Sequence, residues 1–142
     1  MQNSAPDTQD ILKTAKIIAM IGASPNMYRT SNYAFKYLMD EGYKVIPVNP
    51  MVEEVNGEKC YANINDIPES VPVHIVNVFR NKEYTLDEVK EVVAWKNKTG
   101  QKPVIWTQLD VSTPEAEALA VKEGLPYIRN KCIMVELDKL VK

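Results

Sequence analysis

The feature that most constrains the fold is an apolar run, Ile17-Ile18-Ala19-Met20-Ile21, that stops at Gly22. A strand that is apolar on both faces is typical of a parallel sheet covered by helices on both sides. Comparable runs begin about 23 to 30 residues apart, which leaves room for helical crossovers, at residues 43–48, 73–79, 103–109 and 126–128. The sequence therefore predicts an α/β fold with a doubly wound, mostly parallel five-stranded sheet and helices on both faces.

Apolar residues at helical spacing predict the connecting helices. The apolar face of the first is predicted to consist of Tyr33, Ala34, Tyr37 and Leu38. Two later helices begin with a Ser/Thr-x-x-Glu capping pattern, at Thr85–Glu88 and Ser112–Glu115. All three helices end at a glycine, namely Gly42, Gly100 and Gly124. Residues 51–72 predict an irregular crossover with a turn at Asn56-Gly57.

The length and charge of the chain exclude several classes of protein. Its 142 residues amount to about one domain length, so one domain over residues 1–142 is predicted. A formal net charge of −2 without any block of lysine or arginine disfavours binding to nucleic acids or anionic membranes. The sequence lacks a membrane-length apolar run and a secretion signal, which predicts a cytoplasmic protein. A small-molecule ligand is favoured, and a protein partner or a homo-oligomer stays open.

Cysteine and histidine give no metal pattern. Cys60 and Cys132 are far apart in a chain without an export signal, and they form neither a disulfide framework nor a paired zinc spacing. The single histidine, His74, stands at the entry end of its predicted strand, so we interpret it as structural. No metal ligand is therefore predicted.

Ligands of doubly wound sheets bind beyond the carboxyl ends of the strands, where the strand order reverses. The loop after the first run opens with Gly22, which permits a tight turn, and leads into a helix whose amino end favours a phosphate. The residues that we expect there are Gly22, Ala23, Ser24, Pro25, Asn26, Arg29, Thr30 and Ser31. The G-x-G-x-x-G and Walker fingerprints are absent. The alternative is a strand-to-helix turn in which Thr30 or Ser31 caps the helix.

The second predicted strand ends at Asn49-Pro50. NAD-binding folds usually carry an acidic residue here for the ribose 2′-hydroxyl. A neutral amide is more compatible with a phosphorylated ribose, because a carboxylate would repel the phosphate. Asn49 therefore disfavours NAD, although the prolines around it are equally consistent with a stiff exit turn.

The third predicted strand ends at Val78-Phe79-Arg80. Phe79 would provide an apolar shelf for a purine, and Arg80 a cation for its phosphate. The alternative is that Phe79 belongs to the core and that Arg80 pairs with Glu83 on the surface.

The fourth predicted strand ends with Trp106 and Gln108 on one face. This pair combines an apolar plate with an amide that can bind a peptide-like chain, and the alternative is a core tryptophan. Cys132 follows the fifth strand beside Arg129 and Lys131, which would favour its thiolate. A buried filler is the alternative for this cysteine.

Together these residues give a resemblance to a known family. The chain resembles the stand-alone CoA-binding domain proteins of the succinyl-CoA synthetase-like superfamily, and the matching stretches are residues 18–25, 42–50, 78–80, 106–108 and 130–133. The resemblance implies a Rossmann-like domain that binds coenzyme A over the strand ends. It also implies that residues 22–26 lie by the phosphates, that Asn49, Pro50, Val78, Phe79 and Arg80 border the nucleotide, and that Trp106, Gln108 and Cys132 lie toward the pantetheine arm.

One position departs from the family pattern. Members commonly have a glycine shortly after the Trp-x-Gln element, where this chain has Asp110. A carboxylate there would narrow the pocket or repel an anion. The family has no well-established catalytic activity, and the sequence assembles no acid, base and nucleophile triad. The leading hypothesis is therefore a non-catalytic module that binds CoA or acyl-CoA. The alternatives are a redox protein that forms a mixed disulfide between Cys132 and CoA, an NAD(P)-dependent enzyme, and a partner-binding subunit that has lost its ligand.

Overall fold

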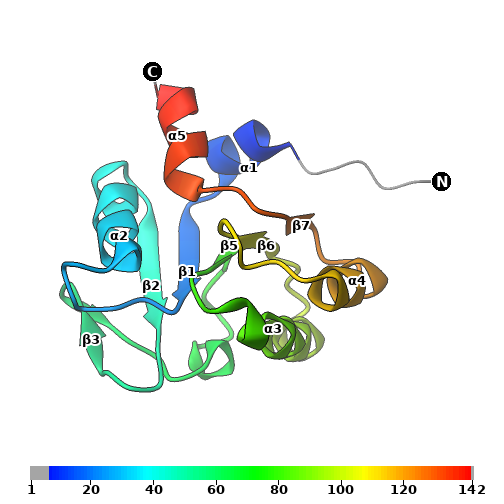
Figure 1. The fold of residues 1–142 in the computed structure, drawn as a ribbon. Helices are drawn as coiled ribbons and strands as arrows, with labels where there is room; N and C mark the ends of the chain where they lie inside the picture. Colours follow the sequence, from blue (N-terminus) through cyan, green and yellow to red (C-terminus); the bar gives the residue numbers. More distant parts are fainter. Residues whose placement is uncertain (1–6, 142) are drawn as a thin grey trace.

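Five parallel strands form one sheet in the order β2-β1-β5-β6-β7 (Figure 1). They are β1 (Ile17–Ile21), β2 (Lys44–Val48), β5 (Ile75–Val78), β6 (Val104–Thr107) and β7 (Tyr127–Ile128). All strand pairings within this five-stranded sheet are parallel in this computed structural model, which confirms the predicted sheet. The structure describes residues 7–141, so residues 1–6 and 142 of the predicted domain lie outside the described part.

The order of the strands reverses at β1. The chain passes from β1 to β2 on one side, with Ile17 opposite Lys44, and then returns to place β5 on the other side. In that second pairing Ile21, the last residue of β1, lies opposite Val78, the last residue of β5. The carboxyl ends of β1 and β5 therefore meet at the reversal point, where doubly wound folds bind their ligands.

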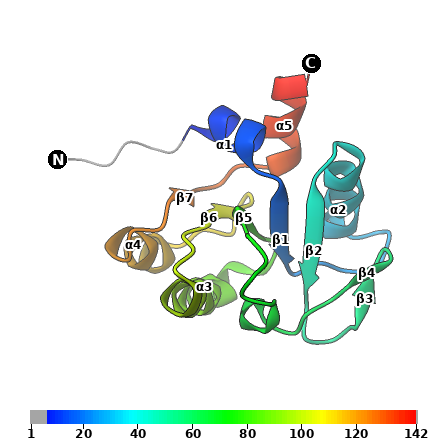
Figure 2. The same cartoon turned by 180° about the vertical axis from the view of Figure 1, so that it is seen from behind.

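Helices cover both faces of the sheet (Figures 1 and 2). One face carries α1 (Thr8–Thr14), α2 (Thr30–Asp40) and α5 (Ile133–Val141), and the other carries the 3-10 helix η1 (Ile64–Asp66), α3 (Thr85–Thr99) and α4 (Pro114–Lys122). Each face buries its own apolar core because strand residues alternate between the two sides. Val76 and Val78 pack beneath α3, whereas Ile75 and Trp106 pack on the side of α2 and α5.

Several local predictions about the helices need correction. Tyr33 is 64% exposed, and the apolar face of α2 contains Phe35 instead. The Thr85–Glu88 capping box does not form, because the Thr85 hydroxyl donates to the Val111 carbonyl at 2.6 Å. Helix α4 is capped by Thr113, which accepts from the Ala116 amide at 3.1 Å, and not by Ser112. The three predicted glycine ends are confirmed, since each glycine has a positive φ just after its helix.

The irregular crossover after β2 contains a small hairpin of β3 (Glu54–Val55) and β4 (Glu58–Lys59). Its turn is Asn56-Gly57, as predicted, and both residues have positive φ angles, as two-residue hairpin turns require. The chain then runs beside the end of β2, where the Asn49 amide donates to the Tyr61 carbonyl at 2.9 Å. The hairpin segment thus holds the β2 exit in place.

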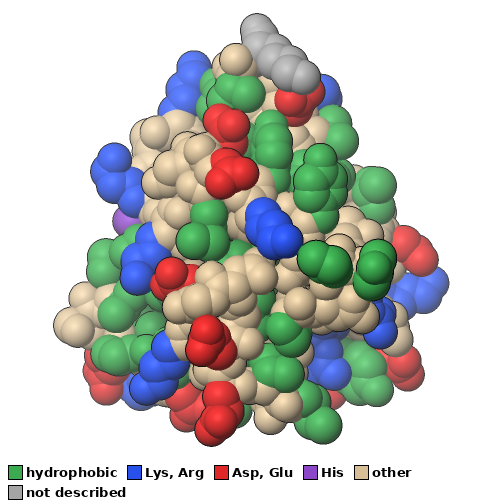
Figure 3. Space-filling view, turned by 90° about the vertical axis from the view of Figure 1, so that its left-hand side faces the viewer, with side chains coloured by type: hydrophobic (Ala, Val, Ile, Leu, Met, Phe, Trp, Pro, Cys, Tyr) green, Lys and Arg blue, Asp and Glu red, His purple; other side chains and the backbone are tan. Residues whose placement is uncertain are grey.

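On the face of the molecule seen in Figure 3, basic and acidic side chains alternate among apolar and neutral ones. The described helices include none long and apolar enough to cross a membrane. At the amino end of the sheet, His74 Nδ1 accepts hydrogen bonds from the Lys16 and Ile17 amides, both at 3.1 Å. This bonding is structural, as expected for that histidine.

Candidate functional site

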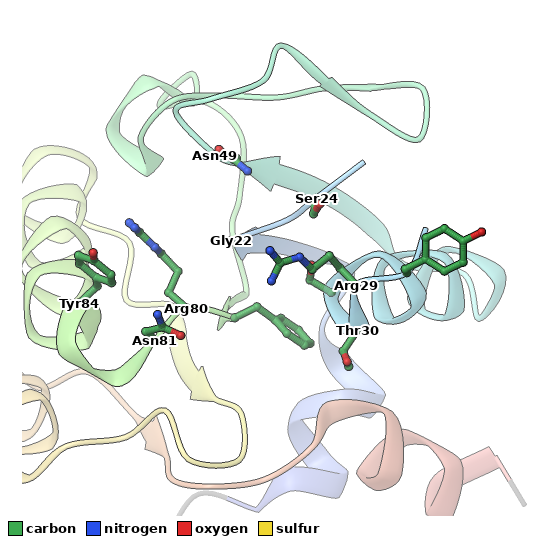
Figure 4. Close-up of a pocket in the computed structure, with 11 residues that line it drawn as sticks. Gly22, Ser24, Arg29, Thr30, Asn49, Arg80, Asn81 and Tyr84 are labelled. Atoms are coloured by element: carbon green, nitrogen blue, oxygen red, sulfur yellow. The ribbon is translucent and has the colours of Figure 1, made fainter. Parts of the chain in front are cut away.

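A cleft of about 570 Å³ lies at the carboxyl ends of β1, β2 and β5, beside the start of α2 (Figure 4). It coincides with the reversal point of the sheet. The predicted site residues that line it are Gly22, Ser24, Arg29, Thr30, Ser31, Asn49, Phe79 and Arg80. Tyr28, Asn81 and Tyr84 also line it, and they were not predicted. The sequence signal for the two tyrosines was the presence of aromatic residues in the loops after the first and third strands, and Asn81 had no signal beyond its position next to Arg80.

Gly22 forms the floor of the cleft through a close approach of two backbones. Its φ is +86°, and a Cβ atom there would lie 2.2 Å from the Phe79 carbonyl oxygen. The Gly22 amide donates to the Val48 carbonyl at 2.9 Å. This amide is therefore engaged within the sheet, and Gly22 contributes to the cleft lining by its lack of a side chain. Glycine is required because β1 and β5 exit side by side.

The loop after Gly22 is held by its own side chains. Ser24 Oγ accepts from the Asn26 amide at 3.1 Å, and Asn26 Oδ1 accepts from the Tyr28 amide at 2.9 Å. From α2, the Asn32 side chain donates to the Ser24 carbonyl at 2.8 Å. The loop therefore has a defined shape before any ligand arrives, which lowers the entropy lost on binding.

Asn49 fixes the same loop from the side of β2. Its Nδ2 donates to the Ala23 carbonyl at 2.8 Å, and its Oδ1 accepts from the Met51 amide at 2.8 Å. Both polar atoms of this side chain are thus engaged in the protein. Asn49 lines the cleft mainly as a support, and it offers no carboxylate to a ribose.

The start of α2 leaves donors free in the cleft wall. Arg29 takes the N-cap position with φ −88° and ψ 141°, and its side chain makes no capping hydrogen bond. Within residues 7–141 no acceptor pairs with the Thr30 or Ser31 amide. The alternative in which Thr30 or Ser31 caps the helix is therefore wrong. These free amides lie at the positive end of the helix dipole, which is where the sequence pattern predicts a preference for a phosphate.

Two arginines enter the cleft from opposite walls (Figure 4). Arg29 comes from the α2 side, and no carboxylate within the described residues forms an ion pair with it. Arg80 comes from the end of β5, and its Nη1 lies 2.9 Å from Oε2 of Glu88. Its guanidinium also stacks 4.3 Å from the centre of the Tyr84 ring. Arg80 therefore pairs with Glu88 on α3 and not with Glu83.

The remaining predicted residues lie outside this cleft. Ala23 and Val78 belong to the two apolar cores, and Pro25, Asn26 and Pro50 lie in the neighbouring loops. Trp106 is fully buried, and its Nε1 donates to the Lys131 carbonyl at 2.8 Å. Gln108 Oε1 accepts from Asn77 Nδ2 at 3.0 Å and from the Ile133 amide at 3.1 Å. In this structure Trp106 and Gln108 join α5 to the sheet.

The two thiols differ in their surroundings. Cys132 is half-buried in the segment before α5, and it does not line the cleft. Cys60 is buried, with its Sγ 3.5 Å from the Asn49 carbonyl oxygen, and burial raises the pKa of its thiol. A raised pKa makes Cys60 a poor nucleophile. Within residues 7–141 no cluster of three histidine, cysteine or acidic side chains is placed to hold a metal ion.

A second cleft, of about 480 Å³, adjoins the first through Arg80 and Asn81. Asp110 lines this second cleft, with φ +60° and a side chain that is 89% exposed. Its carboxylate lies 3.8 Å from the Lys82 ammonium. The left-handed backbone explains why a glycine suits this position. The Asp110 charge faces solvent and Lys82, and Asp110 does not line the first cleft.

Comparisons with known proteins identify the family. A family model described as a CoA binding domain matches residues 16–138, and the chain belongs to this family. The uncharacterized protein YneT of Bacillus subtilis is 35% identical over 136 residues, which cover 95% of this chain and 96% of YneT. An ADP-forming acetate–CoA ligase of Archaeoglobus fulgidus is 38% identical over 63 residues, which are 44% of this chain and 9% of the ligase. The chain is thus homologous to one part of a much longer enzyme.

Solved structures agree with the Rossmann-like fold. A hypothetical protein from Pyrococcus horikoshii superposes with a TM-score of 0.85 at 36% identity, over 100% of both chains. A protein of Thermus thermophilus superposes with a TM-score of 0.84 at 33% identity, covering 95% of this chain and 99% of that one. The predicted family and the α/β architecture are confirmed.

Proposed function

We propose that this protein binds coenzyme A or an acyl-CoA in the cleft at the ends of β1 and β5, as a non-catalytic binding or regulatory module. The observation that carries the proposal is the convergence of Arg29, Arg80 and the free amides of Thr30 and Ser31 on one cleft. Coenzyme A bears a pyrophosphate and a phosphomonoester, which need several cationic or amide donors. Membership of the CoA-binding family supports the same ligand.

The cleft provides different contacts for different parts of such a ligand. The α2 wall offers charge and amide donors, and a charge-assisted hydrogen bond contributes about 1.5–3 kcal/mol. The opposite wall offers the Phe79 and Tyr84 rings with Arg80 between them in sequence, which suits a flat heterocycle. Asn49 offers no carboxylate to a ribose 2′-hydroxyl, so an NAD-dependent enzyme has less support.

The lining residues support binding over catalysis. None of the 11 residues drawn in the close-up is an aspartate, glutamate, histidine, cysteine or lysine (Figure 4). General acid–base catalysis relies mostly on those side chains, and the serine and threonine hydroxyls of the lining have no such base among the lining residues to activate them. Glu88 does not line the cleft, and its carboxylate pairs with Arg80, which does.

Calorimetric titration with CoA, acetyl-CoA, NAD and ADP tests the proposal. CoA should bind more tightly than NAD and ADP, and Arg29→Ala should weaken CoA binding by roughly 10-fold or more, as expected for a lost charge-assisted bond. Arg129→Ala is the matched control, because Arg129 is an exposed arginine that pairs with Glu117 away from the cleft. CoA affinity equal to that of ADP, or equal losses in both variants, would contradict the assignment.

A redox role for Cys132 is the second candidate, favoured by its partial exposure and its free thiol. Its thiolate would attack CoA disulfide, form a mixed disulfide with one CoA and release the other as a thiol. Intact mass after exposure to CoA disulfide tests this, and a Cys132→Ser variant is the control. A cytoplasmic location, the oligomeric state and a single-domain organisation stay predictions.

A further inference from the structure

Behind Arg80, α3 carries two carboxyl groups one helical turn apart. Glu88 is the first, and its side chain is 6% exposed. Glu91 is the second, and it lies beside Glu88 and within hydrogen-bonding reach of Asn63, which precedes η1. Among the described residues, the charged groups that act on Glu91 are Glu88 on its own helix and Arg80 from the end of β5. The cluster therefore joins two acids to one arginine of the cleft wall.

The charges of this cluster do not balance at every pH. Burial, followed by a hydrogen bond with Glu88 and charge repulsion from it, raises the pKa of Glu91 from 4.5 to about 7. Asn63 and Arg80 act in the opposite direction. With Glu91 protonated, Glu88 and Arg80 cancel each other. With Glu91 ionised, the cluster carries one net negative charge next to the cleft.

We propose that the Glu88–Glu91 pair takes up a proton when a phosphate-bearing ligand binds against Arg80. The choice of ligand rests on the proposed function. A phosphate beside Arg80 brings negative charge toward both carboxyls and competes for the guanidinium donors that now neutralise them. The ionised form of the pair becomes less favourable, and the proton binds more tightly. Because binding linkage is reciprocal, the protonated pair holds the ligand more tightly than the ionised pair does.

The experiment is a calorimetric titration of CoA at pH 6, 7 and 8, each in two buffers with different ionisation enthalpies. The wild-type protein should take up a fraction of a proton per CoA near pH 7. From pH 6 to pH 8 the CoA affinity of the wild type should fall several-fold more than that of Glu91→Gln. This extra loss approaches about 10-fold if CoA raises the pKa of the pair by one unit. The CoA phosphomonoester itself titrates near pH 6, but this contribution is common to both proteins.

Asp87→Asn is the matched control, because Asp87 is an exposed acid on the same helix, four residues before Glu91. It should keep the pH slope of the wild type. Equal slopes in wild type and Glu91→Gln, with CoA bound in both, would overturn proton uptake and leave the proposed function intact. Failure of CoA to bind at any of the three pH values would contradict both proposals.

A second measurement avoids the variant altogether. Carbon-13 NMR of the glutamate carboxyls in the wild-type protein follows the titration of Glu91 with and without CoA. The pH midpoint of the Glu91 titration should rise when CoA binds. A titration that does not move in the saturated complex would overturn the inference.

Discussion

The two walls of the cleft present the same side chain in opposite circumstances. Arg29, on the α2 wall, has no ion-pair partner among the described residues, whereas Arg80 is held between Glu88 and the Tyr84 ring. A free guanidinium attracts an anion over a distance but is screened by salt and loses side-chain entropy on binding. A held guanidinium is already oriented, but its charge is largely compensated. One wall is suited to attraction, and the other to orientation and to dependence on pH.

The largest effect should come from the residue that joins the two walls. Gly22→Ala places a Cβ 2.2 Å from the Phe79 carbonyl oxygen, and the backbone there cannot move without breaking the β1–β5 pairing. We expect a loss of about 3 kcal/mol or more in the free energy of unfolding, measured by urea denaturation. Gly100→Ala is the control, because Gly100 has φ +79° and a Cβ added there would meet no neighbouring atom within 4 Å. It should lose only about 1–2 kcal/mol. Similar losses in both variants would contradict the close-approach argument.

Arg80→Ala should lower both the stability and the ligand affinity of the protein, which distinguishes this wall of the cleft from the α2 wall. It leaves the buried Glu88 carboxylate without its partner, so a loss of about 1–3 kcal/mol in unfolding free energy is expected, together with weaker CoA binding. Arg29→Ala should weaken binding while leaving the unfolding free energy nearly unchanged. Denaturation and calorimetry on both variants test the contrast. Identical behaviour of the two would show that the walls do not differ as described.

Glu91→Gln should change how stability depends on pH. Because the folded-state pKa is raised from 4.5 to about 7, the folded protein binds this proton more tightly than the unfolded chain does. Its contribution to stability is therefore present at low pH and declines as pH rises from about 4.5 to about 7. The variant lacks this decline, so the melting temperature of the variant relative to that of the wild type should rise by a few degrees from pH 5 to pH 8. A constant difference across that range would argue against the raised pKa.

Asp110→Gly should have the smallest effect. Glycine removes the strain of φ +60°, for a gain of up to about 1 kcal/mol, and the exposed pair with Lys82 contributes little. CoA affinity should rise less than 3-fold, since the carboxylate lies outside the first cleft. Thermal denaturation and calorimetry would measure both. A large gain in affinity would instead place the ligand across the second cleft.

The sheet and the location of the cleft were predictable because they depend on local patterns. Apolar runs such as Ile17–Ile21, separated by helical segments, leave few alternatives to a parallel sheet. Parallel strands also bring their carboxyl ends to one edge. For that reason the residues after β1, β2 and β5 were correctly expected to lie together, Arg80 and Gly22 among them.

The roles of individual residues were less predictable because they depend on partners distant in sequence. The Gly22 requirement comes from the close approach of Phe79, and which amides of the predicted loop stay free, those of Thr30 and Ser31, is seen only in the structure. Glu88 fits a capping pattern in the sequence, but the structure turns it toward Arg80. In the sequence, Trp106 and Gln108 fit a ligand site as well as they fit an anchor between a strand and a helix. Only their contacts with Lys131 and Ile133 distinguish these two roles.

The empty cap at the start of α2 has a consequence for how sequence variation should act at position 29. A serine or aspartate there would accept hydrogen bonds from the first-turn amides and stabilise the helix. The same amides would then no longer be free to bind a phosphate. The Arg29 side chain makes no such bond, so the first-turn amides of α2 stay available to a phosphate of the proposed ligand. Under the proposed function, α2 should be more stable with the ligand bound than without it, and selection for stability alone would favour a capping residue at position 29.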